Sequence, residues 1–280
     1  MPPLSLVVCL CRERDLLVRL LNQAAGCYDE LVVVHDGPDT TNVREVTVAA
    51  GGRFFERSRE FQQEPHWPFA WAEAKNEWIL RLDADEFPGE AMKEWLKNFR
   101  RLPEPATGIS GCTCIWPWWD GRREVTRKIA PGRMFLFHKQ RVRFFGMAEQ
   151  TPVPDGKMEP LDFILHHQPA RKSYGLYNVL VRKQAYYWRE RIASSLLGKP
   201  TDLPCWRWDD PAWPLVWEQI RQRPLWTAAK RLIKGTLSGW REQWRLEKKL
   251  FPLAAIANPI HHSLICFKHW QLRRKQPTNH

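Results

Sequence analysis

The sequence predicts an α/β fold with a doubly wound, mostly parallel sheet, a mixed-sheet extension and a helical C-terminal region. Short apolar runs alternate with helical patterns through the first hundred residues. From 108 to 170, strand-like runs follow one another, and the residues after 170 have helical, basic patterns. With 280 residues and 44% hydrophobic content, the chain can bury one sizeable core and carry an appendage.

The first hundred residues predict four strands joined by helices. Strands are expected at Leu4–Leu10, Leu31–His35, Arg53–Glu56 and Trp78–Leu82, and helices near Glu13–Ala24, Asn42–Ala50 and Phe69–Asn76. Strands that alternate with helices pair in parallel, so their carboxyl ends are expected at one edge of the sheet, where ligands bind.

The rest of the chain predicts two further regions. The segments GISGCTCIWPWW, GRMFLFHKQRVRFF and LDFILHH indicate strands separated by turns that contain Gly and Pro, forming an extension that would close over the site. A helix is expected from Ser173 to about Leu197, then a Pro- and Trp-rich connector at 199–214 and a basic helical stretch over Leu215–Leu250. The final LRRKQPTNH is expected to fray.

The positive charge of the chain is concentrated after residue 170. Residues 1–170 hold 22 Lys and Arg against 24 Asp and Glu, whereas 171–280 hold 21 against 7, together with nine Trp. Basic residues are attracted to anionic lipid, and Trp prefers the headgroup layer. This region therefore predicts contact with an anionic membrane surface. A solvated basic face over a local Trp core is the alternative; nucleic-acid binding is disfavoured because no RRM, KH, zinc or helix-turn-helix signature accompanies the charge.

The cysteines and the N-terminus predict a cytoplasmic protein. The seven Cys are an odd number without a CxxC spacing, which favours reduced core residues over a disulfide or zinc framework. The opening MPPLSLVVCLCRER lacks the pattern of a signal peptide, and the stretch Leu250–Phe267 is a poor membrane span because it contains Pro, Asn and His. We expect a peripheral location on the inner face of the cytoplasmic membrane.

Acidic residues follow two of the predicted strands. The motif Asp83-Ala84-Asp85 comes directly after WILRL, and HDGPD occupies 35–39 after LVVV. Two carboxylates two residues apart at a strand end can share a divalent cation and leave its other positions to phosphate oxygens. A DxD motif alone is more often a solvated turn, and Asp36-Gly37 alone is an ordinary turn pair.

Two segments together resemble the family-2 glycosyltransferases of the GT-A fold, particularly bacterial enzymes that extend lipopolysaccharide cores. They are DELVVVHDGPDTT (29–41) and AKNEWILRLDADEF (74–87). The resemblance implies a GT-A-like nucleotide-sugar-binding catalytic domain over 1–170, followed by a helical, basic, Trp-rich extension over 171–280. It implies an inverting transfer from a nucleoside-diphosphate sugar to a saccharide or lipid-linked acceptor in cell-envelope polysaccharide assembly.

The resemblance also implies roles for particular residues. Asp36 would contact the nucleotide, Asp83 the ribose or diphosphate, and Arg133 the phosphate or acceptor. Asp85 would bind Mn²⁺ or Mg²⁺, and His166, in preference to its neighbour His167, could complete the metal site.

An inverting transfer needs a general base for the acceptor hydroxyl. By the same resemblance this is Glu149, in FFGMAEQTP, although Ala148 stands where the family usually has His. Glu86 and Asp120 are the rival bases.

The chain departs from the family pattern in two places, which leaves the donor open. Arg12-Glu13 replaces the usual Asn-Glu pair, and HWPFAW occupies the place of an Arg-Asn pair. A catalytically degenerate GT-A scaffold that acts as a membrane-peripheral binding module is the alternative function. A nucleotidyltransferase is disfavoured because no Gly-rich loop bearing Arg or Lys follows the first strand.

Overall fold

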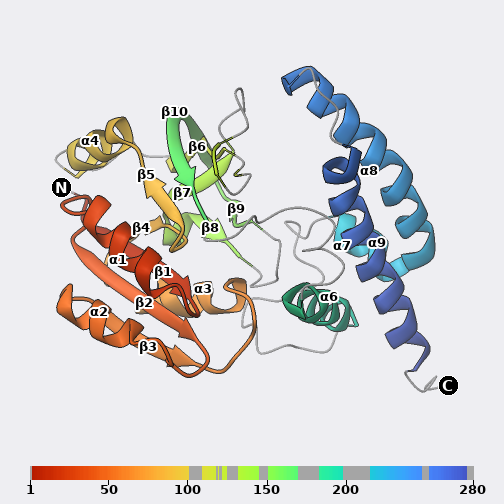
Figure 1. The fold of residues 1–280 in the computed structure, drawn as a ribbon, viewed down its shortest axis with the longest axis horizontal. Coiled ribbons are helices and arrows are strands. Elements are labelled where there is room, and N and C mark those ends of the chain that lie inside the picture. The colour runs from red at the N-terminus through yellow and green to blue at the C-terminus, as the bar shows by residue number, and fades with distance from the viewer. Residues whose placement is uncertain are drawn as a thin grey trace. The chain divides into compact units, whose positions relative to one another are not determined.

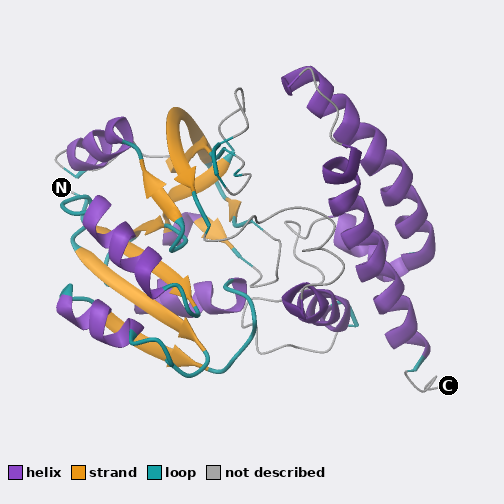
Figure 2. Cartoon of the chain, viewed as in Figure 1, coloured by secondary structure: helices purple, strands orange, loops and turns teal. Residues whose placement is uncertain are grey.

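The computed structural model describes residues 2–100, 109–117, 119, 122–124, 132–144, 151–169, 183–197, 215–247 and 252–275. The chain forms two compact units, Met1–Arg171 and Lys172–His280. Figure 1 labels the elements, and Figure 2 shows strands together with helices in the first unit and helices in the described part of the second.

The first unit is built on an eight-stranded mixed sheet in the order β3-β2-β1-β4-β7-β6-β10-β5. Strands β1 to β4 pair in parallel, and β7 is antiparallel to both β4 and β6. The bounds are β1 (Leu4–Leu10), β2 (Glu30–Asp36), β3 (Arg53–Arg57), β4 (Trp78–Arg81), β5 (Glu86–Pro88), β6 (Ile109–Ile115), β7 (Arg133–His138) and β10 (Lys157–His167). A separate small sheet pairs β8 (Val142–Arg143) with β9 (Val153–Pro154).

Helices cover both faces of this sheet. One core joins the even-numbered residues of β1 to α1 (Arg14–Gln23), α2 (Val43–Ala49) and α4 (Glu90–Phe99). The other core joins Val7 and Cys9 to α3 (Trp67–Glu73), which follows the short 3-10 helix Glu64–His66. Because side chains alternate along a strand and both sides are covered, all seven residues of β1 are buried. The predicted fold class, a doubly wound sheet with a mixed extension and a helical C-terminal region, is confirmed.

The second unit contains four described helices. They are α6 (Lys183–Ser195), α7 (Leu215–Gln222), α8 (Pro224–Glu247) and α9 (Pro252–Arg274). Helices α8 and α9 approach closely where Gly235 faces Pro259: a Cβ on Gly235 would lie 3.1 Å from the proline ring. The Ser263 hydroxyl donates to the Ala228 carbonyl at 3.0 Å. None of the described helices combines the length and the apolar character needed to cross a bilayer.

Several element boundaries differ from the sequence expectations. The basic stretch 215–250 is not one helix, because α7 ends at Gln222 and Pro224, which lacks a backbone N–H, begins α8. Helix α3 begins at Trp67 rather than Phe69. Helix α9 was not expected; it contains Pro259 and continues to Arg274, into the segment expected to fray. Helix α4 was also missed, although Met92, Leu96 and Phe99 have helical spacing and are buried.

The packing of β4 predicts a large difference between two apolar truncations. Leu80 is fully buried, so Leu80→Ala should lower the free energy of unfolding by about 2–5 kcal/mol. Val48 on α2 is 61% exposed, and Val48→Ala should change it by less than about 0.5 kcal/mol. Urea unfolding followed by circular dichroism measures both. Similar losses from the two variants would contradict the burial of Leu80 in the core.

Candidate active site

The acidic motif after β4 lies at the point where the sheet changes winding direction. From β1 the chain adds β2 and β3 on one side and then returns to place β4 on the other side of β1. In open α/β sheets, the crevice beyond the carboxyl ends of strands at such a switch point is where ligands bind. The structure therefore places both predicted acidic clusters, 35–39 and 83–86, at the edge of the sheet where a ligand is expected.

A tight turn fixes the acidic motif. The Glu86 amide donates to the Asp83 carbonyl at 2.9 Å, and the Asp83 amide donates to the Glu86 carboxylate at 2.9 Å. These reciprocal bonds close the turn from β4 into β5. Strand β5 then pairs antiparallel with the end of β10, where His167 lies opposite Glu86.

Arg133 connects the two carboxylates of this turn. Its guanidinium donates to Asp83 at 2.8 Å and lies 2.9 Å from a Glu86 carboxylate oxygen. Strand register explains the contact: β7 pairs antiparallel with β4 through Leu80 and Leu136, so the start of β7 reaches the residues just after β4.

Glu86 is fully buried within this group. Besides its contacts with Arg133 and the turn, it accepts a hydrogen bond from the Trp116 indole at 2.7 Å. A carboxylate held in this way orients Arg133 and the turn, and none of its surface is exposed to an acceptor hydroxyl in this structure. The structure thus argues against Glu86 as the general base. The other two candidates, Glu149 and Asp120, lie outside the described residues.

Asp83 is electrostatically perturbed. Burial and the neighbouring Glu86 raise its pKa to about 7, although Arg133 acts in the opposite direction. Its Oδ1 atom is buried without a hydrogen-bond partner, whereas Oδ2 contacts Arg133. A buried oxygen without a partner costs free energy in the absence of ligand. A cation or a hydroxyl group placed at this oxygen would satisfy it.

A second buried cation, Arg81, is the last residue of β4, two positions before Asp83. Its burial was not expected from the sequence. Its guanidinium packs over the Trp67 ring at 4.2 Å and donates to the Met134 carbonyl at 3.0 Å. Burial, with Arg133 nearby, lowers its pKa to about 10. The available signal was a charged residue inside the apolar run WILRL, since Arg is rarely fully buried without a specific role.

The structure pairs Asp85 with His167 rather than with His166. His167 Nε2 lies 3.4 Å from an Asp85 carboxylate oxygen, and its ring stacks on Trp116 with centroids 4.2 Å apart. His166 contacts Glu124 instead, at 2.6 Å. The reason is the two-residue period of a strand, which directs successive side chains of β10 to opposite faces. The expectation that His166 stands beside Asp85 is thus corrected in favour of His167, whereas a metal role for either residue stays a prediction.

Asp36 is engaged within the protein. Its carboxylate accepts hydrogen bonds from the Glu60 amide at 2.5 Å and the Phe61 amide at 3.0 Å, and it lies 2.9 Å from His66 Nε2. Asp36 therefore fixes the loop after β3. Gly37 follows with a φ of 87°, and a Cβ there would collide with the Arg59 guanidinium. A nucleotide contact by Asp36 stays a prediction.

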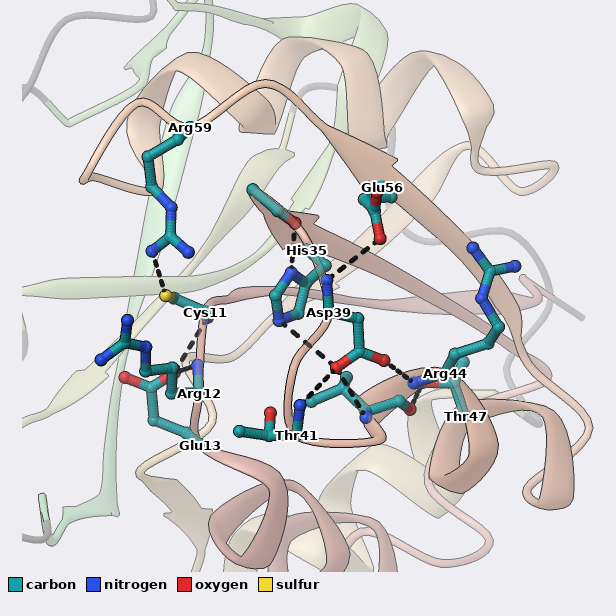
Figure 3. Close-up of polar contacts among 12 residues, drawn as sticks. Cys11, Arg12, Glu13, His35, Asp39, Thr41, Arg44, Thr47, Glu56 and Arg59 are labelled. Carbon is teal, nitrogen blue, oxygen red and sulfur yellow. Dashed lines mark hydrogen bonds and ion pairs between the residues drawn. The ribbon is translucent and has the colours of Figure 1, made fainter.

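Asp39 fixes the loop after β2. Its carboxylate accepts from the amides of Thr41, Val43 and Arg44 at 3.1, 3.2 and 2.8 Å and so satisfies donors at the start of α2. Figure 3 shows this group beside His35, whose Nδ1 lies 2.6 Å from the Gly37 carbonyl oxygen. Asp39 lies in the acidic cluster 35–39, and its bonding to the start of α2 was not expected from the sequence.

The loop after β1 is organised in a similar way. Glu13 accepts from the amides of Cys11 and Arg12 at 2.9 and 2.8 Å. Arg59 reaches from the loop after β3 to the Cys11 sulfur at 2.5 Å, as Figure 3 shows. The three loops that follow β1, β2 and β3 are therefore held in place by contacts within the protein. They form a preorganised border beside the Asp83–Asp85 turn.

Comparisons with known proteins were made for sequence and for structure. No family model matches the sequence, and no curated protein sequence does. In structure the chain is similar to S. aureus TarS, with 12% identity, a TM-score of 0.40 and coverage of 89% of this chain and 46% of that chain. This chain thus spans less than half of that protein's length.

Two further structures cover most of both chains. TarS 1–349 has 11% identity, a TM-score of 0.41 and coverage of 99% of this chain and 93% of that chain. The mannosyltransferase PcManGT from Pyrobaculum calidifontis, in complex with GDP-Man and Mn²⁺, has 15% identity, a TM-score of 0.46 and coverage of 98% and 88%.

The position of Arg133 predicts a strong stability effect. Arg133→Met leaves Glu86 and Asp83 buried without their cation, so the free energy of unfolding should fall by about 3–5 kcal/mol. The loss should grow with pH. Without the cation the pKa of Asp83 in the folded state rises further above its unfolded value, and stability is then lost as pH rises through that pKa.

Arg143 provides the matched control, since it pairs with Asp155 on the surface, and both side chains are more than 40% exposed. Arg143→Met should cost less than about 1 kcal/mol. Urea unfolding of both variants at pH 5 and pH 8 makes the comparison. Equal losses for the two, or a loss independent of pH, would contradict the assigned role of Arg133.

Proposed function

We propose that this chain is an inverting glycosyltransferase that moves a sugar from a nucleoside-diphosphate donor to a saccharide or lipid-linked acceptor in cell-envelope polysaccharide assembly. One observation carries the proposal. The Asp83-Ala84-Asp85 turn lies at the switch point of a doubly wound sheet, and Asp83 presents a carboxylate oxygen without a partner there. The resemblance of the sequence around this turn to the GT-A family supplies the reaction class.

The side chains of the turn suit a divalent cation that also binds the diphosphate of the sugar donor. No group of three or more His, Cys, Asp or Glu side chains in the described part of the chain is arranged to hold a metal ion by itself. Asp85 and the adjacent His167 offer a carboxylate and an imidazole, a pair suited to Mn²⁺, while Mg²⁺ commonly uses one or two carboxylates plus substrate phosphates. When bound, the ion would neutralise charge on the leaving diphosphate.

The surrounding residues would orient the donor. Glu86 holds Arg133 beside Asp83, and the Asp83 oxygen without a partner would receive a ribose hydroxyl or the diphosphate-bound cation. Arg133 brings a fixed positive charge within reach of phosphate. Asp36 would border the nucleotide together with the loop that it anchors. Because these contacts exist before the donor binds, little reorganisation is required when it does.

The proton of the acceptor hydroxyl would go to Glu149, the general base in this proposal. This assignment rests on the resemblance of FFGMAEQTP to the corresponding family segment. The burial of Glu86 and its hydrogen bond with Trp116 favour Glu149 over Glu86, and Asp120 is the other rival.

The metal assignment predicts that nucleotide and cation bind together. A thermal-shift screen of nucleoside diphosphates and nucleotide-sugars should give stabilisation with Mn²⁺ that is lost in EDTA, since a bound ligand adds about 2.7 kcal/mol at a hundredfold excess over Kd. Asp85→Asn should lose this shift and the transfer activity. Asp155→Asn changes an exposed carboxylate between β9 and β10, outside the acidic motif, and should keep both.

Two outcomes of the thermal-shift and activity measurements would contradict the proposal. A shift that persists in EDTA, or in Asp85→Asn, would remove the metal site. Nucleotide and Mn²⁺ binding without transfer or donor hydrolysis across the sugar panel would favour the alternative, a catalytically degenerate scaffold.

The base assignment predicts a separation of binding from turnover. Glu149→Gln should bind the donor normally and lose about 10²–10⁴-fold in rate, because the amide cannot accept the acceptor proton. Asp120→Asn serves as the rival and should retain activity. Steady-state kinetics with the donor found in the screen compare the two variants. An active Glu149→Gln beside an inactive Asp120→Asn would transfer the role to Asp120.

A further inference from the structure

An exposed row of apolar side chains runs along α8. Trp226, Ile233, Leu237 and Trp244, here called the apolar row, are 54–68% exposed. Their spacing of seven, four and seven residues places them on one stripe of a helix. At a rise of 1.5 Å per residue the row is about 27 Å long. Exposed apolar side chains that gather on one side of a helix are typical of an interaction surface.

The apolar row faces away from the partner helix of α8. The contacts of α8 with α9 include Gly235, opposite Pro259, and the Ala228 carbonyl, which accepts from Ser263. Gly235 lies two residues from both Ile233 and Leu237, about 200° around the helix. Figure 1 shows α8 and α9 side by side. These contacts therefore lie on the side of α8 opposite the apolar row, which remains exposed.

A second row on α8 is basic. Lys230, Lys234, Arg241 and Arg245 are exposed and spaced by four, seven and four residues. They lie roughly 70° around the helix from the apolar row, since each residue adds about 100°. We call these four residues the basic row. The helix thus presents an apolar stripe and a positively charged stripe side by side.

We infer that α8 is a membrane-docking helix that lies flat on an anionic lipid surface. The apolar row enters the boundary between headgroups and acyl chains, and the basic row contacts lipid phosphates. The two tryptophans at the ends of the apolar row suit the headgroup layer. The charge of the C-terminal region supports anionic lipid in particular, because 171–280 hold 21 Lys and Arg against 7 Asp and Glu.

Other occupants fit the two rows less well. A twofold pairing of α8 with a second copy would bring two basic rows close together, and their repulsion opposes such a dimer. Single-stranded nucleic acid stacks its bases on aromatic side chains, but the middle of the apolar row is aliphatic, with Ile233 and Leu237. A lipid surface satisfies both rows together.

This inference goes beyond the proposed function, and its test does not depend on catalysis. The full chain is sedimented with vesicles of phosphatidylcholine alone and of phosphatidylcholine mixed with phosphatidylglycerol, at low and high salt. We expect binding to the anionic vesicles that weakens with salt but does not vanish, because salt screens charge and does not prevent insertion of the apolar row. Equal binding to both vesicle types, or binding to neither, overturns the inference.

Two pairs of variants test the rows themselves. Lys230→Glu with Lys234→Glu should weaken anionic vesicle binding by at least about tenfold. Lys75→Glu with Lys157→Glu makes the same change in net charge at exposed positions of the first unit and should have a much smaller effect. Equal losses would mean that overall charge, not the basic row, determines binding.

Ile233→Ser with Leu237→Ser should remove the binding that resists salt, whereas Val48→Ser, at an exposed apolar position on α2, should not. Circular dichroism checks that each variant remains helical. Two results assign the rows to another partner and overturn the inference. Both apply when the full chain does not bind vesicles. One is self-association that Ile233→Ser with Leu237→Ser abolishes. The other is tight binding of an RNA oligonucleotide.

Discussion

One cation held between two carboxylates organises the candidate site. Arg133, from the first position of β7, lies against Asp83 and Glu86 beyond the end of β4. The contact depends on the antiparallel insertion of β7 next to β4, because a parallel neighbour would bring its carboxyl end, not its first residue, to this place. The same arrangement brings Trp116 from the end of β6 and His167 from the end of β10 to the turn. The mixed part of the sheet thus completes a site that the parallel part begins.

This cation does not fully neutralise its surroundings. Two carboxylates share Arg133, and Asp85 adds a third negative group close enough to raise the pKa of Asp83. A carboxylate oxygen that lacks a partner and lies near two other carboxylates is destabilised without ligand and is relieved by a cation. That condition favours cooperation between the ion and an anionic donor, since each supplies charge that the other requires.

The second unit solves a different physical problem. Its helices bury one side against each other through small or compact contacts such as Gly235 with Pro259, and this leaves the opposite side of α8 apolar and basic. Exposure of such apolar side chains to water is unfavourable. The surface suits the boundary of a membrane, where the acyl chains are apolar and anionic headgroups are negatively charged. An enzyme with a lipid-linked acceptor would gain a high local substrate concentration from this contact.

The sequence alone determined the strand–helix alternation, the acidic motif at a strand end and the uneven distribution of charge. Each of these is written in local order: β1 occupies the expected Leu4–Leu10, and Asp83 follows an apolar run that must be a buried strand. The break before α8 is also local, and Pro224 could have indicated it. Only the tertiary structure decided that Glu86 is buried against Arg133, that His167 and not His166 stands beside Asp85, and that Asp36 anchors the loop at 60–61. These contacts join residues 24 to 82 positions apart. A local pattern assigns a side chain to one face of its element, but the register between distant strands determines which partner it meets.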